Sequence, residues 1–148
     1  ADHPLARALA AADPAVASVQ VDRLRRIEGD AATLYFGVFA ALRVAQRDGF
    51  SFRTRSRRPP LDPVNALLSF VYTLLAHDAR AACEAAGLDP AVGYLHEERP
   101  GRPALALDLM EELRAVLPDR LGLSLTNRAE ARPDGFVTTE SGAVTMGD

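Results

Sequence analysis

The chain has 148 residues, which is enough for one domain with a hydrophobic core and too few for two large ones. With 48% apolar residues and a net charge of only −3, the composition excludes a disordered chain and does not argue for or against nucleic-acid binding. All seventeen basic residues are arginine. High genomic GC content could produce that bias, which is also compatible with bidentate phosphate binding.

Cys83 is the only cysteine, so the sequence excludes a disulfide framework and a cysteine-based metal site. Its helical, alanine-rich surroundings predict a small buried residue. The first residues lack the charged start and long apolar run of a signal peptide. The most apolar segment, residues 64–76, is too short to cross a bilayer. We therefore expect a soluble, cytoplasmic protein that does not bind a membrane.

The N-terminal half predicts a lead-in, a long helix and a basic loop. Residues 1–20 are rich in alanine with scattered proline and aspartate, and we expect them to be loosely structured, followed by one domain over residues 21–148. From Val21 apolar residues recur at helical spacing, which predicts a helix of about seven turns ending near residues 47–50. These apolar positions are Leu24, Ile27, Ala31, Leu34, Tyr35, Val38 and Leu42. The loop at 50–60 then carries Arg53, Arg55, Arg57 and Arg58.

The C-terminal half predicts three further helices and a hairpin. Asp62 as N-cap, Pro63 and the stop at Gly87 predict a helix over 62–87, apolar on nearly every side as far as Ala76 and therefore central. An elbow at 93–103 leads to a helix ending at Pro118 and a short helix over 120–128. Alternation about Ser-Gly predicts a hairpin over 134–146. The fold class is mainly α, a helical bundle with a small β-hairpin near the C-terminus, and we expect a fragment of a longer chain.

Glu28 is the first candidate for chemistry. It borders the apolar face of the long helix and is followed by Gly29. A carboxylate beside an apolar surface is costly unless it is paired or liganded, and a helical glycine costs about 1 kcal/mol relative to alanine. The alternative is a surface glutamate paired with Arg25 or Arg26.

The segment "GYLHEERPGRPALALDLMEELR" at residues 93–114 carries the other candidates. His96 lies in a loop bounded by glycine and proline, where a structural role is the alternative. The zinc-peptidase pattern fails because Pro100 stands where the second histidine would be. Asp108 and Glu111 are three residues apart and share a helix face, as solvated acids near a helix start also do.

Together these residues favour a hard-metal site. One imidazole and two or three carboxylates, without a thiol, suit Mg²⁺ or Mn²⁺ better than structural zinc. Such ions serve phosphoryl transfer. Basic residues of the loop and the elbow would then bind the phosphate backbone, and a solvated linker is the alternative for the loop. The candidates for contacting nucleic acid are Arg53, Arg55, Arg57, Arg58, Arg99, Arg102 and Arg128.

Four motifs resemble the catalytic helical domain of the CRISPR adaptation integrases, the Cas-one family. They are "RRIEGDAATLYF", "RRPPLDPVNALLSFVYTLL", "GYLHEERPGRPALALDLMEELR" and "LSLTNR", and the resemblance covers roughly residues 20–148. It implies that Glu28, His96 and Glu111 hold the divalent ion, Mn²⁺ or Mg²⁺, with Asp108 as a further catalytic acid.

The resemblance also implies an activity and partners. The expected reaction is metal-dependent joining of 3′-hydroxyl ends of protospacer DNA to phosphodiesters of the CRISPR repeat, together with endonuclease activity. The expected partners are DNA, a second copy in a homodimer, the small ferredoxin-like Cas-two protein and a Cas-four-type nuclease. The family's N-terminal β-rich domain and last helices are absent from this sequence. The alternatives are a non-catalytic helical module that binds nucleic acid or protein, and a metal-dependent nuclease of another kind.

Overall fold

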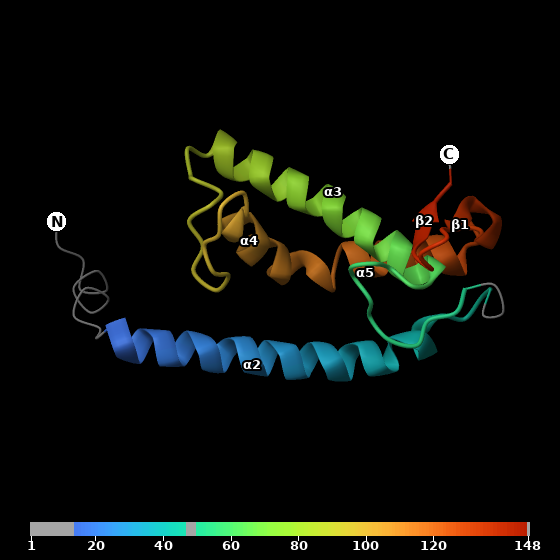
Figure 1. Ribbon diagram of the computed structural model, residues 1–148, viewed down its shortest axis with the longest axis horizontal. Coiled ribbons are helices and arrows are strands. Elements are labelled where there is room, and N and C mark those ends of the chain that lie inside the picture. Colours follow the sequence, from blue (N-terminus) through green and yellow to red (C-terminus); the bar gives the residue numbers. More distant parts are fainter. Residues whose placement is uncertain (1–13, 47–49, 148) are drawn as a thin grey trace. The chain divides into compact units, whose positions relative to one another are not determined.

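The computed structural model describes the backbone of residues 14–46 and 50–147, with side chains described from residue 20 onward. The elements in chain order are α2 (Pro14–Phe39), the 3-10 helix η1 (Ala40–Leu42), α3 (Pro63–Ala85), α4 (Ala104–Arg114), α5 (Pro118–Asn127), the 3-10 helix η2 (Pro133–Gly135), β1 (Phe136–Thr138) and β2 (Val144–Met146) (Figure 1). The predicted fold class, mainly helical with a C-terminal hairpin, is confirmed.

The chain divides into two units, Ala1–Leu34 and Tyr35–Asp148, with the boundary inside α2. Their positions relative to one another are not determined, so each is described by itself. The predicted lead-in over residues 1–20 lies partly outside the described residues. Its last part is helical, because α2 begins at Pro14 rather than at Val21. The alanines of this segment have the highest helix propensity of any residue.

The end of α2 also differs from the prediction, since the helix stops at Phe39 and not near residues 47–50. Asn127 at the end of α5 explains the stop. Its side-chain oxygen accepts hydrogen bonds from the amides of Val44 at 2.8 Å and Ala45 at 3.2 Å, and its nitrogen donates to the Leu42 carbonyl at 3.2 Å. These bonds hold the chain after η1 in a non-helical path.

The apolar face predicted for this helix is wrong at its C-terminal end. Val38 and Leu42 are exposed, whereas Phe36 and Phe39 are buried against Phe52. Each ring buries more apolar area than a valine or leucine, and the rings meet in tilted and edge-on contacts that aromatic pairs favour.

Helix α3 is the centre of the second unit, as predicted, and it contacts α4, α5 and β2. Asp62 caps it by accepting the Asn65 amide at 2.7 Å, and Gly87 follows its end with a positive φ of 74° that suits glycine. Cys83 is buried beside Ala79 and Ala106 of α4, in agreement with its predicted role.

Helix α4 ends at Arg114 rather than at Pro118, because that proline begins α5. Proline lacks an N–H and suits the first turn of a helix better than its end. The hairpin pairs Phe136 with Met146, and the Val144 amide donates to the Pro60 carbonyl at 2.8 Å, which joins the hairpin to the basic loop. Among the described residues, no helix is long and apolar enough to cross a membrane.

Candidate active site

The carboxylate of Asp108 organises the loop that carries His96. Its Oδ2 accepts hydrogen bonds from the amides of Tyr94 at 2.6 Å and Leu95 at 3.0 Å. Its Oδ1 accepts the His96 amide at 2.9 Å and contacts Nδ1 of the His96 ring at 2.7 Å. One side chain in α4 therefore fixes both the backbone of the loop and the orientation of the imidazole.

These contacts keep Asp108 ionised. Burial opposes the charged form, but the Tyr94 amide, the His96 ring and the amides of Leu95 and His96 together outweigh it, so the pKa of Asp108 lies below its usual value. Because both oxygens already accept hydrogen bonds, Asp108 is better suited to orienting His96 than to binding an ion directly.

A second anchor of this loop is the contact between Gly93 and Ala104, the first residue of α4. A Cβ at Gly93 would lie 2.6 Å from the Ala104 Cβ and 2.9 Å from its carbonyl carbon. Only glycine permits this approach. The Leu105 amide also donates to the Pro90 carbonyl at 2.9 Å, so the loop is attached to the start of α4 at several points.

His96 and Glu111 face each other across a short gap. A carboxylate at Nδ1 favours the tautomer protonated there, which leaves the lone pair on Nε2. That Nε2 lies 3.9 Å from Glu111 Oε1, and the two side chains are 19% and 17% exposed. A neutral imidazole nitrogen and a carboxylate oxygen that converge in this way fit a divalent cation, with Asp108 behind the histidine.

The structure does not place Glu28 relative to these groups. It lies half-buried on α2 in the unit Ala1–Leu34, while His96, Asp108 and Glu111 belong to the other unit. Over residues 20–46 and 50–147, no group of three or more histidine, cysteine, aspartate or glutamate side chains is arranged to hold a metal ion. The described residues thus supply two converging donors, and a third ligand remains a prediction.

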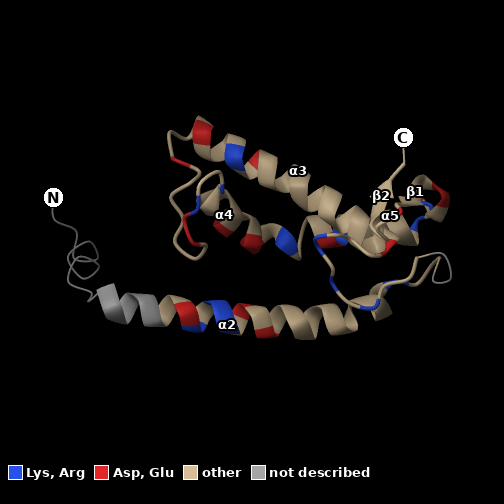
Figure 2. Cartoon of the chain, in the orientation of Figure 1, with Lys and Arg blue, Asp and Glu red and all other residues tan. Residues whose placement is uncertain are grey.

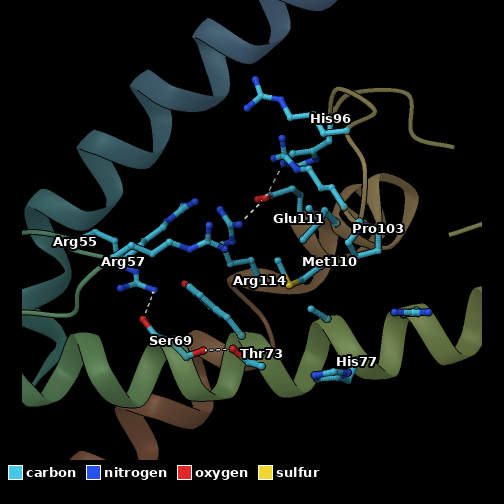
Figure 3. Close-up of a pocket in the computed structure, with 18 of the residues that line it drawn as sticks. Arg55, Arg57, Ser69, Thr73, His77, His96, Pro103, Met110, Glu111 and Arg114 are labelled. Atoms are coloured by element: carbon cyan, nitrogen blue, oxygen red, sulfur yellow. Dashed lines mark hydrogen bonds and ion pairs between the residues drawn. The ribbon is translucent and has the colours of Figure 1, made fainter. Parts of the chain in front are cut away.

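His96 and Glu111 line a cavity of about 930 Å³ together with basic residues from four segments (Figure 3). The arginines that line it are Arg55, Arg57, Arg58, Arg80, Arg99, Arg102 and Arg114. Five of the seven predicted nucleic-acid contacts are therefore in one cavity. Arg53 and Arg128 are exposed and are not among its lining residues, and Arg128 pairs with Glu130 at 3.2 Å.

The basic loop reaches the cavity because Asn65 attaches it to α3. This fully buried side chain accepts the Ser56 amide at 2.9 Å and Arg55 Nη1 at 2.7 Å, and donates to the Thr54 carbonyl at 2.8 Å and Asp62 Oδ2 at 2.7 Å. Arg55 also donates to Ser69 Oγ at 3.2 Å. Arg55 thus serves the local structure, whereas Arg57 and Arg58 are exposed at the cavity.

Sequence reasoning missed Asn65 and two residues beside Glu111, namely Arg114 and Tyr72. The signal for Asn65 was a polar residue inside an apolar helix, which has to be hydrogen-bonded when buried. The signal for Arg114 was its position three residues after Glu111, the spacing of neighbouring side chains on a helix. Figure 2 shows this pattern as acidic residues along α4 followed by a basic one at its end.

Comparison with known proteins identifies the family. The chain matches the family described as CRISPR associated protein Cas1 over residues 3–148, and it belongs to that family. It is 57% identical over 159 aligned positions to the CRISPR-associated endonuclease Cas1 2 of Rhodospirillum rubrum, covering all of this chain and 46% of the relative. It is 57% identical to the CRISPR-associated endonuclease Cas1 1 of Chlorobaculum tepidum, covering 84% of this chain and 36% of that protein.

Solved structures give the same assignment. A Cas1 protein from Thermotoga maritima is similar with a TM-score of 0.78 at 32% identity, covering 86% of this chain and 40% of that one. A casposase bound to an integration product has a TM-score of 0.77 at 28% identity, covering 86% and 36%. The chain spans less than half the length of these relatives.

Proposed function

We propose that the protein is a divalent-metal-dependent DNA endonuclease and integrase of CRISPR spacer acquisition. The observation that carries the proposal is the approach of His96 Nε2 to Glu111 Oε1 at 3.9 Å inside an arginine-lined cavity. Support also comes from the relatives, which are named Cas1 endonucleases, and from the similar casposase bound to an integration product.

In this proposal His96, Glu111 and Glu28 hold Mn²⁺ or Mg²⁺, and Asp108 orients His96. When bound, the ion activates an oxygen nucleophile and stabilises negative charge on the phosphate under attack. Arg57, Arg58, Arg99 and Arg102 bind phosphates on the DNA backbone without reading its sequence, because phosphate contacts position a duplex but do not distinguish bases.

The proposed integration reaction is a transesterification. The 3′-hydroxyl oxygen of the protospacer forms a bond to a phosphorus of the CRISPR repeat. The bond from that phosphorus to the 3′-oxygen of the repeat strand breaks, and the departing oxygen ends with a proton. One phosphodiester replaces another, so the reaction needs no external source of energy.

The proposed partners follow from the names of similar proteins. Two similar structures are Cas6-RT-Cas1–Cas2 complexes, and two relatives are fusions of a Cas4 exonuclease with a Cas1 endonuclease. We therefore propose protospacer and repeat DNA, a Cas2 protein and a Cas4 nuclease as partners, and a homodimer as the working form.

Blocking the attacking group tests this function. In the full-length protein with its partner, integration into repeat DNA should require Mg²⁺ or Mn²⁺ and a free 3′-hydroxyl. Protospacers ending in dideoxynucleotides should give no joined product on a denaturing gel, while matched hydroxyl ends do. Joining with blocked ends would exclude the mechanism.

A non-catalytic module that binds nucleic acid is the second candidate. One observation favours it, namely that the described residues contain no complete three-ligand group. Such a module would bind DNA through the arginines and would not bind Mn²⁺, so a Mn²⁺ titration of the full-length protein separates the two functions.

A further inference from the structure

Arg114 lies in the last turn of α4 and contacts the same oxygen of Glu111 that faces His96. Its Nη2 donates to Glu111 Oε1, one turn earlier in the helix, and that oxygen lies 3.9 Å from His96 Nε2. Both partners are well buried, with side chains 13% and 17% exposed. The direction in which the Glu111 carboxylate points is therefore tied to the position of the guanidinium (Figure 3).

The guanidinium of Arg114 is in turn held by a ring on α3. Its Cζ lies 5.2 Å from the centroid of the Tyr72 ring, within the range of a cation–π contact. Arg114 Nε is buried and has no hydrogen-bond partner among the described residues. The pair with Glu111 and the stacking on Tyr72 are thus the two contacts that define where the guanidinium lies.

Tyr72 is fixed by a buried carboxylate on α5. Its hydroxyl donates to Asp119 Oδ1, and the two residues are 8% and 1% exposed. Burial raises the pKa of the Tyr72 hydroxyl, and the hydrogen bond and charge of Asp119 raise it further, so the hydroxyl stays protonated and remains a donor. Three helices, α3, α4 and α5, therefore meet in one series of contacts that ends at Glu111.

We propose that Arg114 is a positioning residue for Glu111 and that Tyr72, anchored by Asp119, is the platform that places Arg114. The inference rests on the proposed function, since it takes Glu111 as a ligand of the divalent ion. Its physical content is that a carboxylate without a fixed orientation binds the metal more weakly. Groups that orient ligands in this way commonly change metal affinity by about 10- to 100-fold.

A purely electrostatic role for Arg114 predicts the opposite sign. A guanidinium close to a cation site repels the incoming cation, so its removal should strengthen binding if charge alone matters. The direction of the change in affinity therefore separates positioning from repulsion.

The test measures Mn²⁺ affinity of the full-length, DNA-free protein by electron paramagnetic resonance of free Mn²⁺. Arg114→Met should weaken binding about tenfold. Tyr72→Leu, which removes the ring without changing the charge, should weaken it in the same direction. Arg80→Met is the matched control, because Arg80 lines the same cavity but pairs with Glu84 at 2.9 Å rather than with Glu111. Thermal unfolding without metal establishes that each variant is folded.

Weaker binding in Arg114→Met with unchanged binding in Arg80→Met supports the inference. Equal or tighter binding in Arg114→Met, or an equal change in both variants, overturns it. If Arg114→Met does not fold, Arg114→Lys keeps the charge without the planar group, and wild-type affinity in that variant overturns the inference. Glu111→Ala separates the two levels: if it retains wild-type Mn²⁺ affinity, the proposed function fails, whatever Arg114 does.

Discussion

Single side chains at the start of α4 determine where His96 lies. Asp108 accepts four hydrogen bonds from residues 94–96, and Gly93 packs directly on Ala104. Both features act on backbone atoms, so small changes at these positions should alter stability and the site together.

Gly93→Ala tests the close approach to Ala104. The added Cβ would meet side-chain and backbone atoms at 2.6 and 2.9 Å, so the loop has to shift. We expect a loss of about 1–3 kcal/mol in the free energy of unfolding, together with weaker Mn²⁺ binding. Urea unfolding and a Mn²⁺ titration measure these effects. Gly135→Ala is the control, since its Cβ would meet nothing within 4 Å. Equal stability of the two variants would contradict the packing argument.

Asp108→Asn tests the carboxylate through pH. The folded protein lowers the pKa of Asp108, so its charged form contributes stability above the unfolded pKa of about 3.9, and that contribution is lost as pH falls through the lower folded pKa. Above pH 5 the variant should be less stable than wild type by about 2 kcal/mol. The difference should shrink below pH 4. A constant difference in urea unfolding from pH 7 to pH 3 would show that the charge is not the cause.

At the scale of elements, the basic loop and the elbow converge on one cavity because α3 holds the first and α4 holds the second. The loop depends on Asn65, which satisfies its polar groups with bonds to residues 54–56 and 62. Exposed arginines on a fixed backbone lose less conformational entropy when they bind phosphate than arginines on a flexible linker would.

Arg57→Gln with Arg58→Gln tests the loop. We expect weaker DNA binding for every sequence, and a log–log salt slope reduced by roughly 0.9 for each phosphate that the variant no longer neutralises. Fluorescence anisotropy of the full-length protein on duplex and splayed DNA at several salt concentrations measures both. Arg120→Gln is the control, because Arg120 is exposed on α5 and does not line the cavity. Unchanged affinity and slope in the double variant would indicate a solvated linker and move the DNA path toward Arg99 and Arg102.

At the scale of the whole molecule, the predicted ligands come from both units of the chain. A site built from separate elements exists only in the folded protein, so Mn²⁺ should raise the melting temperature by mass action. Replacing Glu28, His96 or Glu111 by alanine should each remove the rise while the helical circular dichroism persists. A full rise in His96→Ala would reject the assignment of this site, and one confined to Glu28→Ala would exclude only that ligand.

The sequence by itself determined the helices, the hairpin and the family, because helical spacing, N-caps, glycine stops and long motifs are local. It placed Asp108 and Glu111 on one face of α4 for the same reason. It misplaced both ends of α2, since the Asn127 bonds that stop this helix come from residues far along the chain.

Only the tertiary structure decided what surrounds Glu111. The spacing of Arg114 was visible, but its stacking on Tyr72 and the anchor at Asp119 join three helices. The buried face of Phe36 and Phe39 and the attachment of the basic loop through Asn65 are likewise long-range. Such contacts depend on which surfaces meet when the helices pack, and local spacing along the chain carries no information about that choice.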